Sequence, residues 1–387
     1  MLVTDFRRLL SHFHTMQAKR YLVPVLVAAG LSAPLMGALS LGEGSELFLN
    51  GTVGFQYDDN MFLRSTGAKG DYVTTFTPGV EVQFGQNSLA KGSFIYNEAF
   101  ARYNSHSSQD SNLASLGFNT NYDDGKTKAS FGASYNQVAQ NTVDARLAGI
   151  LVRRDVSGVN GRGEWTMSDK TSFAAGATFD RTDYKTAGFV TSNDYSVPLD
   201  FYYEMMPKVD LSVEYKFRET DLANNQPKDT DNFFGVGARG QFSEKLSGEY
   251  HIGYTQRHFG SGTGNESLLG VDSNFIYLFS PKTTVTLGLS NDFDNAATGV
   301  SQKVLSGRFG VKTEFEEGFS GSVNVSYRDL NYNSGEHDHY WEGNIGLQEQ
   351  YNKYLSFMAG YTFRHNDSNL PVGFADNVFS VSGTVRY

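Results

Sequence analysis

The chain has no cysteine among its 387 residues, which removes disulfide bonds and thiolate metal sites from consideration. Positive charge is in deficit, since 32 Lys and Arg stand against 42 Asp and Glu, for a formal net charge of −10. A nucleic-acid partner would require a basic stripe, so this balance argues against one. After about residue 40 no stretch is apolar enough for a membrane-spanning helix.

Aromatic residues are abundant instead. The sequence holds 30 Phe, 22 Tyr and 41 Gly, although only 39% of its residues are hydrophobic. So many aromatic and so few aliphatic residues are unusual for a soluble core. The composition suits a barrel whose outer face is aromatic and whose inner face is wet.

From about residue 45 onward, segments of roughly 12–15 residues alternate apolar and polar side chains. In the stretch 209–218 the apolar set is Val209, Leu211, Val213, Tyr215 and Phe217. The polar set is Asp210, Ser212, Glu214, Lys216 and Arg218. Strand side chains point alternately to two faces, so this segment has one apolar and one charged face. The pattern is typical of a bacterial outer-membrane β-barrel.

The N-terminus resembles a secretory signal peptide. Lys19 and Arg20 precede an uncharged, mostly apolar run over 22–39, which ends in the small residues around Ala38 and Ser40. We predict a signal peptide over 1–40 with cleavage near 38–40, and a start at Met16 would already give a complete signal. A retained inner-membrane anchor is the rival, because the run is about long enough to span a bilayer. Two prolines within the run favour cleavage.

Turn residues divide the rest of the chain into about 18 segments. The segments begin near residues 46, 71, 89, 111, 126, 150, 171, 193, 209, 230, 246, 266, 283, 300, 319, 338, 354 and 373. Tight Gly, Pro, Asn and Asp turns alternate with longer polar loops, as they do between the two rims of such barrels. We predict an all-β fold, a transmembrane antiparallel up-and-down β-barrel of about 18 strands (16–18), as one domain over 46–387. A soluble propeller is the alternative, but it would need aliphatic buried faces and a blade-length repeat.

The polar faces of these strands would line the lumen, because a charge facing lipid costs about 2–4 kcal/mol at mid-depth. A barrel of this size leaves room for an aqueous channel, whereas about eight strands would be filled by their own side chains. Rings of mixed charge would then act as an electrostatic filter for polar solutes. The pore-lining candidates are Glu214, Lys216, Arg218, Arg239, Glu249, Arg257, Arg308, Lys312, Arg328, Glu342 and Arg364.

No predicted loop exceeds about 13 residues, which is short for a loop that folds into the lumen as a constriction. We therefore expect a wide pore or one narrowed by inward side chains such as Arg239 and Tyr202. Large, ohmic conductance would follow from either arrangement.

Few residues are arranged for catalysis or metal binding. The cluster His337-Asp338-His339 could hold a metal, but no further ligand is visible in the sequence. Ser, His and Asp partners of a hydrolase can come from different strands, yet nothing at fixed spacing indicates them. We predict no catalytic, cofactor-binding or metal site, and no enzyme.

One local motif closes the first strand, Phe55-Gln56-Tyr57-Asp58-Asp59-Asn60-Met61-Phe62. An Asp/Asn-rich turn at the rim would explain it without further function. A first strand that ends in Tyr-Asp-Asp-Asn and an apolar pair, together with an aromatic C-terminal strand, resembles the outer-membrane β-barrel porins found with exopolysaccharide export systems. The resemblance implies an outer-membrane pore, with export of a secreted polysaccharide as its specific form.

The leading hypothesis is thus an outer-membrane channel that passes polar solutes. A barrel hydrolase or lipid-modifying enzyme and a structural or adhesion barrel are the alternatives. Expected partners are outer-membrane lipid, the barrel-assembly machinery and periplasmic polysaccharide export components. The outward residues of the last strand form a candidate assembly signal, namely Phe379, Val381, Val385 and Tyr387.

Overall fold

The computed structural model describes residues 39–42, 44–223, 227–262 and 264–387. The described residues form nineteen strands and one short 3₁₀ helix, η2 (Ser107–Gln109). The strands are β1 (Leu39–Gly42), β2 (Ser45–Asp58), β3 (Asp71–Phe84), β4 (Ala90–Tyr103), β5 (Ser111–Asp123), β6 (Thr127–Ala139), β7 (Arg153–Ser168), β8 (Thr171–Tyr184), β9 (Ser192–Met206), β10 (Val209–Leu222), β11 (Asp229–Gln241), β12 (Leu246–His258), β13 (Asn265–Ser280), β14 (Thr283–Asn295), β15 (Ser301–Glu316), β16 (Phe319–Tyr332), β17 (His337–Gln350), β18 (Leu355–Ser368) and β19 (Phe374–Arg386). Within this part of the chain, no helix is long and apolar enough to cross a membrane.

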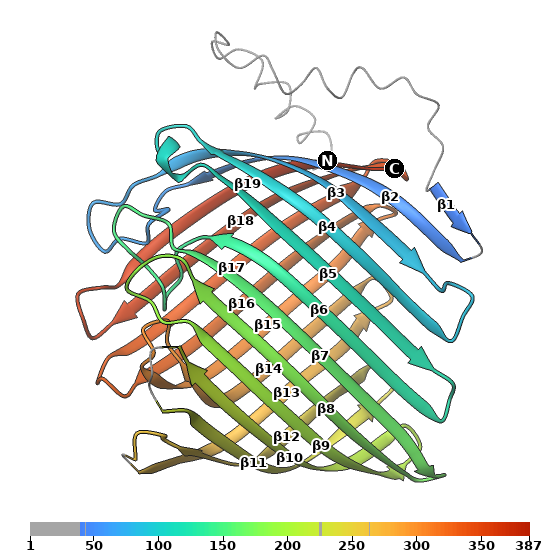
Figure 1. Ribbon diagram of the computed structural model, residues 1–387. Coiled ribbons are helices and arrows are strands. Elements are labelled where there is room, and N and C mark those ends of the chain that lie inside the picture. Colours follow the sequence, from blue (N-terminus) through green and yellow to red (C-terminus); the bar gives the residue numbers. More distant parts are fainter. Residues whose placement is uncertain (1–38, 43, 224–226, 263) are drawn as a thin grey trace. The chain divides into compact units, whose positions relative to one another are not determined.

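Strands β2–β19 form one closed barrel (Figure 1). Each pairs antiparallel with its neighbour in sequence, and β19 closes the ring by pairing with β2 over Val378↔Asp58 to Arg386↔Asn50. Closure leaves no strand edge in the ring, so every backbone N–H and C=O can find a partner within the sheet. The predicted up-and-down barrel of eighteen strands is confirmed for the described residues.

The predicted segment starts lie within three residues of the observed strands, and the largest offset is at β7. That strand follows a 13-residue connection, 140–152, which has no regular alternation to mark its end. The short β1, which pairs with β2, was not predicted. The predicted signal peptide lies almost entirely outside the described residues, so its cleavage near 38–40 stays a prediction.

Two prolines lie inside strands, where a residue without an N–H interrupts the hydrogen-bond ladder. Pro78 of β3 pairs with Gly51 on one side, but on the β4 side the pairing stops at Phe76 and resumes at Gly79. Pro198 of β9 likewise falls in a gap between Ala175 and Thr178 of β8. The register is the same before and after both gaps, so the sheet accommodates each proline by a local loss of pairing and not by a bulge.

The two faces of each strand differ as the alternation predicts. On β10 Val213 is 59% exposed on the outer face, whereas its neighbour Ser212 on the inner face is 4% exposed. Outward residues of the last strand are also exposed, including Phe379, Val381 and Val385. These three lie where an assembly signal was expected, and that role stays a prediction, as it does for Tyr387.

Candidate channel interior

Charged side chains on the inner face contact strands that are not their neighbours in the sheet. Arg239 of β11 donates from Nη1 to Glu164 Oε2 of β7 at 2.8 Å, and from Nε to Asp210 Oδ2 at 3.0 Å. β7 and β11 are four positions apart in the ring, so this contact runs across the concave interior. The inner face therefore carries a connected set of ion pairs and not only separate wall charges.

Arg239 and Tyr202, which the sequence predicted to point inward, lie against each other on the inner face. The Arg239 guanidinium lies 3.4 Å from the centroid of the Tyr202 ring. Arg162 donates to the Tyr202 hydroxyl at 2.9 Å and lies 2.8 Å from Asp200. A stacked, paired arginine is fixed in orientation, so this group forms a rigid part of the wall.

A second cluster lies toward the rim that carries the longer loops, here called the loop rim. Arg257 is 1% exposed and donates from Nε to Asp231 Oδ1 at 2.7 Å. Arg218 shares Asp231, at 2.6 Å from Nη2, and lies 3.0 Å from Asp292 of β14. The buried Arg257 and the partly buried Arg218, held by two carboxylates, form a closed network, since each charge has a partner of opposite sign.

The remaining candidates fall into two groups. Six have charged or aromatic neighbours: Glu214 lies 3.5 Å and Glu249 3.8 Å from His251, Lys216 lies over the Phe233 ring, Arg364 lies 3.4 Å from Asp376, and both Arg328 and Glu342 contact Tyr340. Arg308 and Lys312 have no hydrogen bond or ion pair with any described residue. Arg308 lines a cavity of about 530 Å³ together with Asp272 and Glu342. The strand register puts every predicted residue on the inner face, and their pore-lining role stays a prediction.

The motif at the end of β2 fastens the barrel where its first and last strands meet. The backbone N–H and the Nδ2 of Asn377 in β19 donate to the two Asp59 oxygens, each at 2.7 Å. Asn60 donates from Nδ2 to the carbonyl oxygens of Arg64 at 2.9 Å and Ala375 at 2.8 Å. These bonds turn the connection 59–70 inward and bury the apolar pair Met61 and Phe62.

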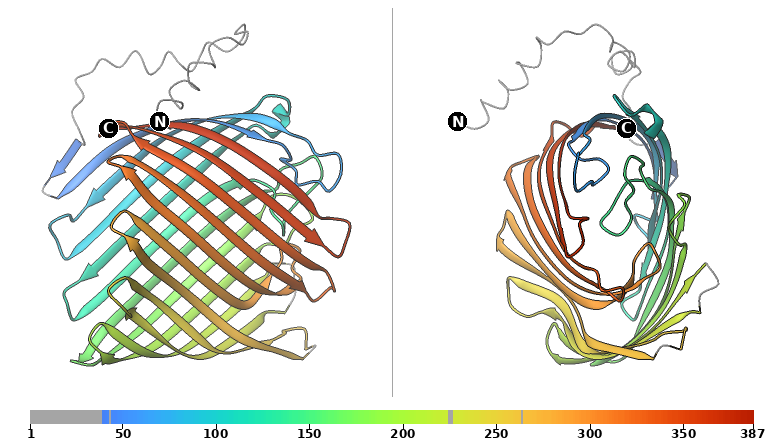
Figure 2. Two further views of the ribbon diagram at one scale, coloured as in Figure 1. Left: turned by 180° about the vertical axis from the view of Figure 1, so that it is seen from behind. Right: turned by 90° about the vertical axis from the view of Figure 1, so that its left-hand side faces the viewer.

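A second inward loop, 140–152, packs on the first. Asn141, 1% exposed, donates from Nδ2 to the carbonyl oxygens of Phe62, Leu147 and Ile150, and accepts from the Val152 N–H. The buried amide of Asn141 thus connects the two ends of loop 140–152 to each other and to connection 59–70. Figure 2 shows the two loops within the barrel mouth in its right-hand view.

The far side of loop 140–152 reaches the opposite wall. Asp144 accepts from the Tyr332 hydroxyl of β16 at 2.9 Å and lies 3.7 Å from Arg328. Val143 packs in an apolar cluster with Tyr340 of β17 and Phe374 of β19. A cavity of about 360 Å³ remains between residues 140–143 of the loop and the wall residues Arg328, Glu342 and Arg364.

The expectation that no loop is long enough to enter the lumen is therefore wrong. Thirteen residues could span about 43–47 Å if fully extended, so this length is enough to cross the mouth and return. What the loop needs is an anchor on the far wall, which Asp144 and Val143 supply. The length of a loop gives no information about such anchors. Apolar residues inside an otherwise polar loop do, because they indicate that the loop packs against another part of the molecule.

Comparison with known proteins places the chain among porins. The family model described as "Putative beta-barrel porin 2" matches residues 50–387. No curated protein sequence matches the chain.

Solved structures with a similar fold include three outer-membrane proteins. Pseudomonas aeruginosa OpdK with vanillate is 11% identical, with a TM-score of 0.46, and the match covers 88% of this chain and 99% of that one. Acinetobacter baumannii OccAB4 is 15% identical, with a TM-score of 0.46 and coverage of 90% and 100%. Pseudomonas aeruginosa OccK2 (OpdF) in complex with glucuronate is 11% identical, with a TM-score of 0.48 and coverage of 91% and 100%.

Proposed function

We propose that this chain, which belongs to the beta-barrel porin family and lies in the bacterial outer membrane, is a channel that admits small polar solutes and is restricted at its loop rim. Membership of this family supports a porin-like channel, and it favours the channel over the enzyme and the adhesion barrel. The narrowing of the channel at the loop rim goes beyond what the family implies. In porins the longer loops face the cell exterior, so a solute entering from outside would meet loops 59–70 and 140–152 first.

One observation carries the proposal, namely the contact of loop 140–152 with the opposite wall. The loop is held at its base by Asn141 and at its tip by Asp144 and Val143. A segment tied at both ends cannot move aside without breaking several buried contacts. We therefore expect it to divide the mouth into smaller openings and to set the size limit for entry.

Beyond the loops, the solute would meet the free charges of the wall. Arg308, exposed and without a partner among the described residues, lines a cavity of about 530 Å³ together with polar residues such as Asn324 and Asn344. An unpaired guanidinium attracts carboxylates and other anions, and its effect is strengthened in a confined, low-dielectric space. This supports the role of Arg308, with Lys312, as a pore-lining residue for solutes that carry negative charge.

Polysaccharide export, implied by the resemblance of the first-strand motif, is a finer hypothesis. The contacts of Asp59 and Asn60 are with β19 and with their own loop, so they account for the motif by its fastening role. None of these contacts favours a polymer over a small solute. We therefore restrict the proposal to small polar solutes.

Single-channel recording in planar bilayers tests the restriction. A variant in which residues 141–151 are replaced by a short Gly-Ser turn should conduct severalfold more than the unmodified barrel. Asp144→Asn combined with Arg146→Gln should give an intermediate gain, because Arg146 also lies over the Phe374 ring at the loop tip.

Asp367→Asn is the matched control, since Asp367 is an exposed charge at the same rim on the outer face and does not contact the loop. Its conductance should equal that of the unmodified barrel. If the barrel with the shortened loop conducts no more than the unmodified one, the restriction proposed here is wrong.

A further inference from the structure

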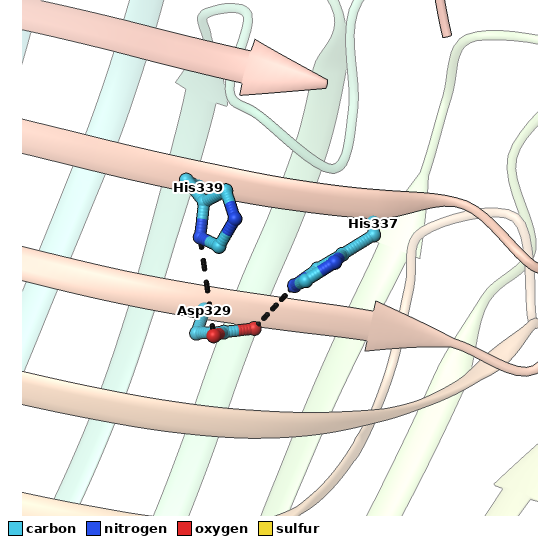
Figure 3. Close-up of side chains that lie close together, drawn as sticks. All are labelled: Asp329, His337 and His339. Carbon is cyan, nitrogen blue, oxygen red and sulfur yellow. Dashed lines mark hydrogen bonds and ion pairs between the residues drawn. The ribbon is translucent and has the colours of Figure 1, made fainter. Parts of the chain in front are cut away.

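We propose that Asp329, His337 and His339 form a binding site for a divalent transition-metal ion such as Zn²⁺, on the outer face of the barrel near the loop rim. Figure 3 shows the three side chains converging from two adjacent strands. His337 and His339 open β17, and Asp329 lies near the end of β16, directly opposite His339 in the register. Strand alternation puts the two histidines on one face, with Asp338 between them on the other.

The ligand atoms are already gathered. His337 Nε2 lies 2.8 Å from Asp329 Oδ1, and His339 Nδ1 lies 3.9 Å from Asp329 Oδ2. One ligand atom from each of the three residues lies within 4.8 Å of the other two. Ligands of a tetrahedral Zn²⁺ with bonds of about 2.0–2.2 Å are about 3.3–3.6 Å apart, so small side-chain rotations would complete the site.

The donor types select the metal. Two imidazole nitrogens with one carboxylate oxygen suit Zn²⁺, Ni²⁺ or Cu²⁺, whereas Ca²⁺ and Mg²⁺ prefer sites made of oxygen atoms. Three protein ligands leave a coordination position for water, as in open zinc sites. The cluster is partly exposed at all three side chains, so an ion can enter from solvent.

The surroundings hold the carboxylate ligand in place, since Asp329 Oδ1 also accepts from Asn331 Nδ2 at 2.8 Å. The Tyr327 hydroxyl lies 2.8 Å from His339 Nδ1, so it has to turn away for a metal to bind at that nitrogen. The Tyr327 ring in turn packs on Trp341, with ring centroids 4.4 Å apart. Aromatic residues of this kind mark the membrane interface of outer-membrane barrels, so the site lies beyond the hydrocarbon, where water and ions are present. A hydrogen-bonded carboxylate is part of the usual outer-shell support of a metal site.

The test is direct metal binding by the full barrel. Chelator-treated protein without a histidine tag, folded in detergent, is titrated with ZnCl₂ in a calorimeter, and Cu²⁺ binding is followed by electron paramagnetic resonance. We expect one ion per chain with a dissociation constant of about 10 µM or tighter, and hyperfine coupling to two nitrogens. His337→Gln, His339→Gln and Asp329→Asn should each weaken binding about tenfold or more.

His365→Gln is the matched control. His365 lies on the same outer face opposite Trp341 and is exposed to a similar degree, 38% against 44% for His339, but it is paired only with Asp367. Binding by this variant should be unchanged, and heat-modifiable migration should show that all five variants fold, the double variant included. Saturable binding that survives in His337→Gln/His339→Gln, or equal weakening by His365→Gln, would overturn the proposal, as would no saturable binding by the unmodified barrel.

Discussion

The loop rim and the middle of the barrel both carry inward-facing arginines, but these arginines differ in burial and in ion pairing. Near the rim, Arg257 is buried and shares Asp231 with Arg218. In the middle, Arg308 is exposed in the lumen and has no partner among the described residues. A buried pair is costly to break and gives a passing ion little net charge, whereas an unpaired exposed charge contributes little to folding and acts fully on a solute. The four arginines Arg218, Arg239, Arg257 and Arg308, which the alternation treats alike, are therefore not equivalent.

Arg257→Gln should have the largest effect on stability. The change leaves Asp231 buried with half of its ion pairs, and it removes bonds to Asn295 and Ser301. We expect the free energy of unfolding to fall by about 3–5 kcal/mol. Guanidinium unfolding in lipid vesicles, followed by tryptophan fluorescence, measures it. Arg181→Gln, at an exposed outward arginine, is the control with about 0.5 kcal/mol or less expected. Equal losses of unfolding free energy in Arg257→Gln and Arg181→Gln would show that the buried ion pair at the loop rim contributes no more to stability than an exposed charge.

Asn60→Ala should have the next largest effect. It leaves the carbonyl oxygens of Arg64 and Ala375 and the N–H of Arg64 without their present partner at the join of β2 and β19. Unpaired buried polar groups cost about 1–3 kcal/mol, so stability should fall by that amount. Because connection 59–70 supports loop 140–152, the open-channel current should also become noisier. A variant with unchanged stability and a quiet current would show that the motif does not fasten the rim.

Arg308→Gln should change selectivity without changing stability beyond about 0.5 kcal/mol. Removing one unpaired positive charge from the lumen should make the channel more cation-selective, as measured by the reversal potential in a salt gradient. Arg308→Lys keeps the charge and should keep the selectivity. The opposite result, a larger shift for a folded Arg257→Gln channel than for Arg308→Gln, would mean that the buried pair faces the permeation path.

Tyr254→Leu should have the smallest effect. Tyr254 is exposed on the outer face of β12, so the change exchanges one lipid-facing apolar side chain for another. We expect the reversal potential to stay the same and the yield of folded barrel to fall slightly. A shift in selectivity here would mean that inner and outer faces have been assigned the wrong way round.

The strands were predictable because local rules set them. Alternation in β10 and the tight turns at 124–126 and 207–208 fix which residues pair and which face is wet, and neither depends on distant parts of the chain. How the sheet accommodates Pro78 and Pro198, in contrast, depends on the neighbouring strand.

The candidate site was predictable only in part. The inner-face charges could be named, because each follows from the parity of its own strand. Their pairing could not, since Arg239 meets Glu164 and Arg218 meets Asp292 only after the ring has closed and curved. The third member of the metal cluster was missed for the same reason, because Asp329 joins His337 and His339 through the β16–β17 register.

By itself, then, the sequence determined the barrel, its strand number and the two chemical faces, because these depend on residues two apart and on turns a few residues long. Only the tertiary structure decided that loop 140–152 crosses the mouth and that Arg308 is free while Arg257 is not. Both outcomes depend on which side chains meet across the lumen. Those side chains come from strands far apart in the chain, and a periodic pattern records the direction of a side chain but not its partner.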